Sequence, residues 1–157
     1  MRPAPAELKR FLAAYDASIG TLFLAGRAAV LAAAPSANEL IYDAYNAVSA
    51  AYSFSPRLQE AFCHVAAYAG HVNLGFNRGA ALPDPDGLLA GSGARIRHIR
   101  IGAASDLEQP GVQRLLCLAV EEGRAAAAAA APTRGRAAGA STIRPTHGAK
   151  RRPAAKR

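Results

Sequence analysis

The chain has 157 residues, which is enough for one domain and leaves little room for a second core. Half of the residues are apolar, but many of these are alanine and tryptophan is absent, so we expect a modest core. The formal charge of +8 is concentrated at one end, because residues 132–157 hold eight Lys or Arg and no acid, whereas residues 1–131 hold eleven of each sign. The composition therefore predicts a neutral domain, residues 1–131, followed by a basic tail, residues 132–157.

A helical pattern occupies the beginning of the chain. Pro5 suits a first helical turn, and apolar residues then recur at helical spacing as far as Pro35. An interruption near residues 18–20 indicates either one kinked helix or two short ones. Arg27 lies among small residues of this pattern and is predicted to face solvent. Asp16 and Arg27 also argue against a secretory signal and a membrane span, because both need an unbroken apolar run.

Strand patterns follow this helical segment. Four strands are predicted, at residues 39–44, 47–54, 61–68 and 71–76. The last two alternate between apolar and polar residues on either side of Gly70, which predicts an antiparallel hairpin. In this hairpin Val72, Leu74 and Phe76 are expected to face the core.

The next segment is rich in Gly, Pro and Asp, which is typical of a turn. Asp84 or Asp86 is predicted to cap one helical turn at Gly87–Leu89, and Gly91 is predicted to close it.

The strand that follows this turn contains a conflict of parity. Ile96 is out of step with Ile99 and Ile101, so one regular strand cannot bury all three side chains. The sequence predicts a bulge near Arg97–His98, or a strand that only begins there.

The last helix is predicted to begin at Pro110 and to be strongly amphipathic. Its apolar face consists of Val112, Leu115, Leu116, Ala119 and Val120. The alanine run 125–131 prolongs this helix as far as Pro132. The basic tail is rich in Ala, Gly, Pro and Arg or Lys, and it is predicted to be disordered. The order of the elements predicts an α+β fold, a two-layer sandwich of an antiparallel sheet packed by N- and C-terminal helices.

Two cysteines, Cys63 and Cys117, each lie in an apolar stretch. They are too few for a disulfide framework, so we expect buried, reduced thiols in a cytosolic protein. A catalytic thiolate would need an activating neighbour, and His64 is expected to point to the opposite face of the strand from Cys63.

Residues 71–101 carry a long motif. Its members are His71-Val72-Asn73-Leu74-Gly75-Phe76, Gly79, Leu82-Pro83-Asp84-Pro85, Leu88-Leu89, Gly91, Gly93 and Arg97-His98-Ile99. Together with the upstream segment AAAPSANELIYDAY, this motif resembles the YdhG-like family, domain of unknown function 1801, over about residues 19–122. The resemblance implies a frataxin-type α–β sandwich that has no known activity in most members and is called an iron chaperone in some. The chain departs from the family at Ala94, where members commonly carry lysine, and the first helices carry only Glu7 and Asp16 as acids.

The candidate ligand-binding residues lie in the same segment. They are His71, Asn73, Gly91, Gly93, Arg95, Arg97 and His98. The histidines and the asparagine, with His64, form either a hydrogen-bonded polar face or a divalent-metal cluster. The lack of HxH or HxxxH spacing and of a carboxylate on these strands favours the polar face, so no metal ligand is predicted. The glycines and arginines could hold an anion, although two glycines before a strand also suit a simple turn.

No catalytic motif occurs in the sequence, which has no Gly-x-Ser-x-Gly, no HExxH and no paired carboxylates on a helix face. We therefore expect a non-enzymatic, cytosolic binding or accessory domain without a cofactor and without membrane contact. The alternative is a small-ligand, anion or metal-binding domain, similar to an iron chaperone, that uses the polar face of the sheet.

The basic tail carries the candidate nucleic-acid contacts. They are Arg134, Arg136, Arg144, Lys150, Arg151, Arg152, Lys156 and Arg157. With no aromatic residue among them, these cations can neutralise phosphates but cannot stack on bases, which predicts weak binding without sequence preference. A solubilising extension without further function is the alternative.

Overall fold

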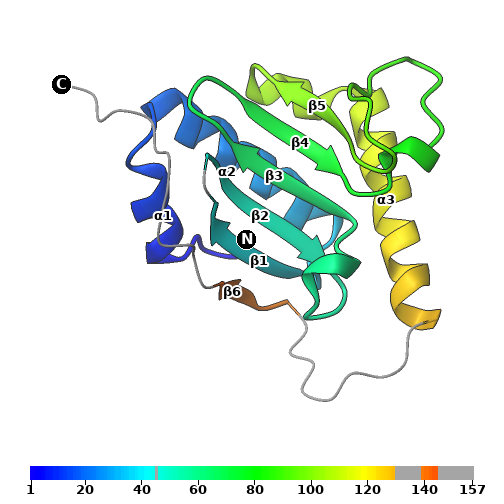
Figure 1. The fold of residues 1–157 in the computed structure, drawn as a ribbon, viewed down its shortest axis with the longest axis horizontal. Coiled ribbons are helices and arrows are strands. Elements are labelled where there is room, and N and C mark those ends of the chain that lie inside the picture. Colours follow the sequence, from blue (N-terminus) through cyan, green and yellow to red (C-terminus); the bar gives the residue numbers. More distant parts are fainter. Residues whose placement is uncertain (45, 130–138, 145–157) are drawn as a thin grey trace.

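The structure is a computed structural model that describes residues 1–44, 46–129 and 139–144 (Figure 1). The helices in this part of the chain are α1 (Ala6–Leu12), α2 (Ala17–Ala33) and α3 (Pro110–Ala129). The strands are β1 (Asn38–Asp43), β2 (Val48–Ser53), β3 (Cys63–Ala67), β4 (Val72–Phe76), β5 (Arg97–Ile101) and β6 (Ser141–Ile143). Short 3₁₀ helices lie at Leu58–Glu60, Gly79–Ala81 and Ala104–Glu108.

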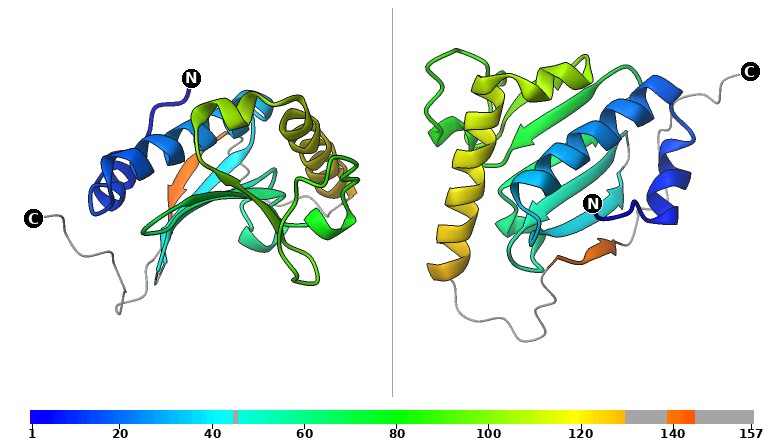
Figure 2. Two further views of the ribbon diagram at one scale, coloured as in Figure 1. Left: turned by 90° about the horizontal axis from the view of Figure 1, so that it is seen from above. Right: turned by 180° about the vertical axis from the view of Figure 1, so that it is seen from behind.

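The strands form one open sheet in the order β5-β4-β3-β2-β1-β6. Strands β1 to β5 are an antiparallel meander, in which each strand pairs with the next, and β6 is added parallel to β1 at the edge. Figure 2 shows α2 and α3 on the same face of this sheet. Figure 1 looks onto the opposite face, where Leu58 of a short 3₁₀ helix packs against a small cluster of Leu40, Ala51 and Ala61. The predicted α+β sandwich is therefore confirmed, and only one face of its sheet forms the main core.

The main core lies between this sheet and the two longer helices. The predicted core side of β4 is buried: Val72, Leu74 and Phe76. The predicted apolar face of α3 is also buried along its whole length. Gly26 lets α2 approach β3 closely, because a Cβ at that position would lie 3.2 Å from a methyl carbon of Val65. The periodicity of the apolar residues thus predicted the main core correctly.

The first helical pattern forms two separate helices, which is one of the two predicted alternatives. The break lies at residues 13–16 rather than near residues 18–20, because the N–H groups of Ile19 and Gly20 already donate helical hydrogen bonds to the carbonyl of Asp16. Asp16 therefore begins α2, and the chain changes direction before it.

Strand β5 begins at Arg97 and pairs regularly with β4 as far as Ile101. The predicted bulge at Arg97–His98 is therefore wrong, and the alternative of a strand that begins there is correct. Ile96 lies before the strand with 49% of its surface exposed, so the parity conflict does not arise.

The loop before β5 contains no helical turn at Gly87–Leu89, contrary to the prediction. Asp84 nevertheless caps backbone amides, since its carboxylate accepts hydrogen bonds from the N–H groups of Leu88 and Leu89 at 2.9 and 3.0 Å. Gly87 has a φ of +62°, which glycine adopts at little cost. The local chemistry predicted from the sequence is present, but it stabilises an irregular loop.

Part of the tail is ordered, which corrects the prediction of disorder for residues 139–144. The N–H of Glu39 donates to the carbonyl of Ala140, and the N–H of Arg144 donates to the carbonyl of Ile41, so β6 completes the edge of β1. An edge strand offers unpaired N–H and C=O groups, and even a segment of three residues can pair with them. The other tail residues, 132–138 and 145–157, lie outside the described residues.

Arg27 is buried with 4% of its surface exposed, so its predicted position in solvent is wrong. Its Nε and Nη2 donate to the two carboxylate oxygens of Glu39 at 2.8 and 3.0 Å. The remaining donors reach backbone carbonyls near the N-terminus, those of Arg2 at 2.9 Å and Pro3 at 3.2 Å. The bidentate pair explains how a guanidinium can lie inside the core.

The Glu39 carboxylate accepts two further hydrogen bonds. The Tyr52 hydroxyl donates to one oxygen at 2.9 Å, and the Ser141 hydroxyl donates to the other at 2.7 Å. Burial, followed by the neighbouring carboxylate, raises the pKa of Tyr52 well above its ordinary value. We call Arg27, Glu39, Tyr52 and Ser141 the buried polar cluster, and it joins α2, β1, β2 and β6 at one point.

We expect Arg27→Met to lower the free energy of unfolding by about 3–5 kcal/mol, because it leaves a buried carboxylate without its cation. The double variant Arg27→Met, Glu39→Gln should lose less, since no charge is then buried. Urea denaturation measures both values. The control is Arg10→Met, which removes an exposed ion pair with Glu7 and is expected to cost about 0–1 kcal/mol. Equal losses for the single and the double variant would contradict this account of the cluster.

We expect Leu74→Ala to lower the free energy of unfolding by about 2–5 kcal/mol, because Leu74 is fully buried under the helices. Leu24→Ala on α2 is the control, since 36% of the Leu24 surface is exposed and its loss should be much smaller. A loss below about 0.5 kcal/mol for Leu74→Ala would show that this side of β4 does not face the core.

Candidate functional site

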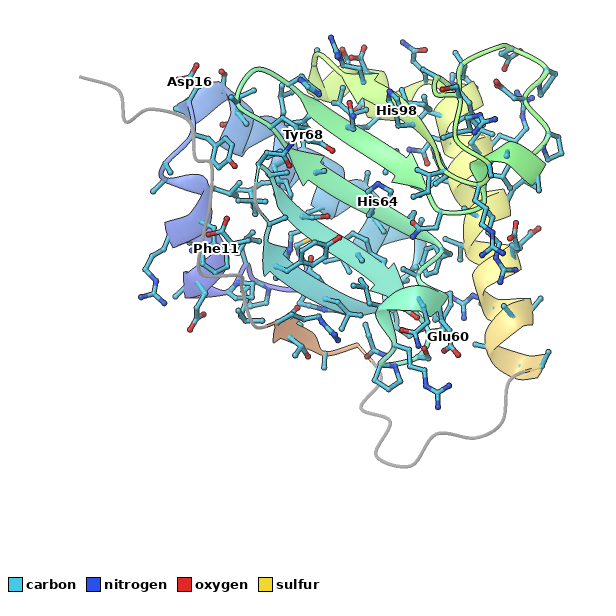
Figure 3. The ribbon with its side chains drawn as sticks, viewed as in Figure 1. Phe11, Asp16, Glu60, His64, Tyr68 and His98 are labelled. Atoms are coloured by element: carbon cyan, nitrogen blue, oxygen red, sulfur yellow. The ribbon has the colours of Figure 1, made fainter. Side chains whose placement is uncertain are left out.

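The face of the sheet opposite the helices carries small and polar side chains. The alternate strand residues enter the main core, and those between them face outwards. The outward residues of the five antiparallel strands include Leu40, Tyr42, Ser49, Ala51, His64, Ala66, Asn73, Gly75, His98 and Arg100. Leu40, Ser49, Ala51 and Ala66 among them are buried, so the accessible part lies mainly at His64 and on β4 and β5. We call this set the open sheet face, and Figure 3 shows His64 and His98 on the side of the sheet that is turned towards the viewer.

His64 lies near the centre of the open sheet face. Its ring crosses over the neighbouring strand, where a Cβ on Gly75 would overlap the ring atoms. Nδ1 is 2.8 Å from the side-chain oxygen of Asn77, an acceptor, so the hydrogen bond places the proton of the neutral ring on Nδ1. Glycine at position 75 is therefore what allows an imidazole to lie across the sheet.

The pKa of His64 is lowered from its ordinary value, mainly by burial and to a smaller extent by His98. The hydrogen bond to Asn77 opposes this shift. The pKa of His71 is also lowered, by partial burial and then by the positive charges of Arg100 and His98. We call His64, His71, His98 and Arg100 the basic group, because charge on His98 disfavours protonation of His64 and His71, and charge on Arg100 disfavours protonation of His71.

Further ring and amide groups border this basic group. The rings of Tyr68 and His71 stack with their centroids 4.7 Å apart, at the turn between β3 and β4. Asn73 lies opposite Arg100 in the ladder, and its side-chain oxygen is buried without a hydrogen-bond partner. An unpaired buried acceptor costs folding free energy, and this oxygen is shielded from a molecule bound on the face because it has almost no accessible surface.

The structure therefore brings together only part of the predicted site. Asn73 and His98 lie on the open sheet face, and His71 lies in the turn before β4, where its ring stacks on Tyr68. Arg97 has the opposite parity, and its guanidinium donates to carbonyls of its own loop, those of Gly93 and Ile96.

The predicted anion loop is not assembled. Gly91 has a φ of +119° and packs near the His98 ring, so it serves the turn. Arg95 lies elsewhere, beside Arg78 in a shallow depression whose other residues are alanines. The Gly-rich segment thus closes a loop, and its arginines do not converge with the histidines.

The predicted ligand-binding residues did not include Arg100 and Tyr68. Arg100 has the same parity as His98, so the strand alternation could have placed it on this face. The Tyr68–His71 stack depends on the tight turn between two strands, which parity alone does not show.

The described residues contain no group of three His, Cys, Asp or Glu that could hold a metal ion, so the metal alternative has no site there. Cys63 is buried as predicted, and burial raises the pKa of its thiol. Cys117 is exposed, contrary to the prediction, because it lies one helical step beyond the buried face of α3.

Comparison of the chain with protein-family models, with curated proteins and with solved structures finds no match. Among the described helices, none has the length and the hydropathy that a membrane crossing requires. The chemistry of the open sheet face is therefore the main guide to function.

The lowered pKa of His64 predicts a pH dependence of stability. The unfolded chain, in which histidine titrates near 6.5, binds this proton more readily than the folded chain does. The contribution of His64 to the free energy of unfolding is thus fully present above pH 6.5. It is lost as the pH falls through the lower pKa that His64 has in the folded chain. We expect the free energy of unfolding to decrease more steeply below pH 6.5 in the native protein than in His64→Gln, as measured by urea denaturation at several pH values. Parallel pH profiles would contradict the shift.

Proposed function

We propose that this protein is a non-enzymatic binding domain for single-stranded nucleic acid, in which the open sheet face contacts the bases and the basic tail contacts the phosphates. The observation that carries the proposal is the chemistry of the accessible part of this face. The outward strand positions of β1 to β5 that reach the surface are Tyr42, His64, Asn73, His98 and Arg100, and none of them is an acid.

The ring groups favour single strands over duplexes. Unpaired bases stack on flat side chains and on guanidinium groups, whereas the bases of a duplex have no free faces. Tyr42, His64 and Tyr68 are half-buried residues on or beside the open sheet face, so part of each ring faces outwards. Arg100 is exposed among them and suits either a base or a phosphate.

The position of β6 supports a joint role for the sheet and the tail. Arg134 and Arg136 precede β6, and Arg144 follows it directly. Strand β6 is paired at the edge of β1, which is the opposite edge of the sheet from β5 and Arg100. A strand of nucleic acid that crosses the open sheet face from β5 to β1 would thus reach the positive charge of Arg144.

We also propose that the chain is related to the YdhG-like family and is cytoplasmic. The family proposal is supported by the motif of residues 71–101, which forms one continuous unit of β4, loop and β5. The location is supported by Cys63 and Cys117, which are both free cysteines.

We expect the tail to contribute affinity for any nucleic acid. A chain that ends at Arg144 keeps β6 and removes five cations: Lys150, Arg151, Arg152, Lys156 and Arg157. If these contact phosphates of a labelled 20-mer, their loss should reduce the log–log salt slope by about 3.5 on single strands. Fluorescence anisotropy across a salt series measures this slope. An unchanged slope would show that the tail does not contact phosphates.

We expect the open sheet face to provide the preference for single strands. Arg100→Gln and Tyr68→Ser should each weaken binding of a single-stranded 20-mer, Tyr68→Ser by about fivefold or more because stacking is worth about 1–3 kcal/mol per base. Binding of the matching duplex should change much less. The control is Arg114→Gln, which removes an exposed arginine from α3 on the other face. If both face variants bind single strands like the native protein, the open sheet face is not the binding surface.

A further inference from the structure

A cavity of about 140 Å³ opens between the C-terminal half of α3 and the connection from β2 to β3. Its apolar wall is formed by Phe54 and Phe62, whose rings stack with centroids 5.0 Å apart. Ala126 and Ala127 of α3 face these rings. Ser53, the last residue of β2, is the one residue of the described strands that lines this cavity, so the cavity lies beside the end of the sheet and away from His64, His98 and Arg100.

Small residues on α3 create this space. Phe62 packs directly on Gly123, where a Cβ would lie 2.6 Å from the ring. One turn further along the helix, Ala126 and Ala127 are too short to fill the volume beside the two phenylalanines. A cation–π contact also stabilises the position of Phe54, because the Arg124 guanidinium lies 4.7 Å from the centre of its ring.

Charges of both signs surround the opening. Glu60, Arg78 and Glu122 all line the cavity. The Arg78–Glu122 pair is long at 3.5 Å, and Glu60 pairs with Arg57 at 3.7 Å. Long, partly exposed ion pairs contribute little to stability. Glu60, Arg78 and Glu122 can therefore leave these pairs and bind a ligand with little loss of folding free energy.

We infer that this cavity binds a small zwitterion with an apolar side chain, such as a free aromatic α-amino acid. The ligand ammonium group matches Glu60 and Glu122, the ligand carboxylate matches Arg78, and the side chain enters between the phenylalanine rings and α3. A cavity of about 150 Å³ is known to hold a benzene ring, so the volume suits a phenyl side chain. This inference does not depend on the proposed nucleic-acid function.

The test is a titration of the ¹⁵N-labelled full chain with L-phenylalanine, followed by NMR shifts of the Phe62 and Gly123 amides. Phenethylamine and 3-phenylpropionate serve as matched probes, because each keeps the ring and one of the two charges. We expect saturable shifts with L-phenylalanine and at least about tenfold weaker binding of either probe. Absence of saturable shifts, or a singly charged probe that binds as tightly, would overturn the inference.

Two variants locate the ligand. Ala126→Leu fills the cavity and should weaken L-phenylalanine binding by about tenfold or more, whereas Ala128→Leu, at an exposed position of the same helix, should leave it within about twofold. Arg78→Gln removes the carboxylate partner without changing the cavity wall, and it should abolish the advantage of L-phenylalanine over phenethylamine. Native affinity in both Ala126→Leu and Arg78→Gln would place the ligand elsewhere.

Discussion

The buried pair of Arg27 and Glu39 is the interaction on which the rest of the structure depends. A guanidinium and a carboxylate in the core are tolerable only if nearly every donor and acceptor is satisfied. Here the partners come from the N-terminal segment, α2, β1, β2 and β6. The pair therefore joins these elements at one point inside the main core, and the hydrogen bond from Ser141 holds β6 in its register on β1. Hydrophobic packing depends less on exact geometry than these hydrogen bonds do. Packing alone would allow a strand as short as β6 to pair with β1 in several registers.

Placing all the longer helices on one side of the sheet determines what the other side can be. Antiparallel sheets tolerate one solvated face, and such a face normally alternates with the buried one. In this protein the outward positions are mostly small or polar. In the middle of the sheet the His64 ring lies over Gly75, which has no side chain. The same alternation that builds the core therefore also supplies the candidate binding surface.

Sequence reasoning predicted the helices, an antiparallel sheet and the core side of β4, because apolar periodicity is strong in those segments. It failed at Arg27, although the spacing from Phe23 to Arg27 and on to Val30 places that residue on the buried side of α2. Its partner Glu39 likewise shares the parity of the buried Ile41. A charged residue considered alone was predicted to be exposed. A buried ion pair becomes evident only when the positions of Arg27 and Glu39 are considered together. For the candidate site, parity gave Asn73 and His98. The orientation of Arg97 depends on loop geometry that composition does not show.

The contact between Ser141 and Glu39 joins residues that are 102 positions apart. During synthesis α2, β1 and β2 leave the ribosome long before β6 does. The carboxylate of Glu39 therefore lacks the hydrogen bond from Ser141 until β6 has been made. Contacts of such large sequence separation form late, because closing the intervening loop costs entropy first. The chain can thus collapse early around an incompletely solvated charge, and this hydrogen bond forms only after β6 has been released. Completion of the polar cluster is in this way linked to the synthesis of a segment 102 positions further along the chain.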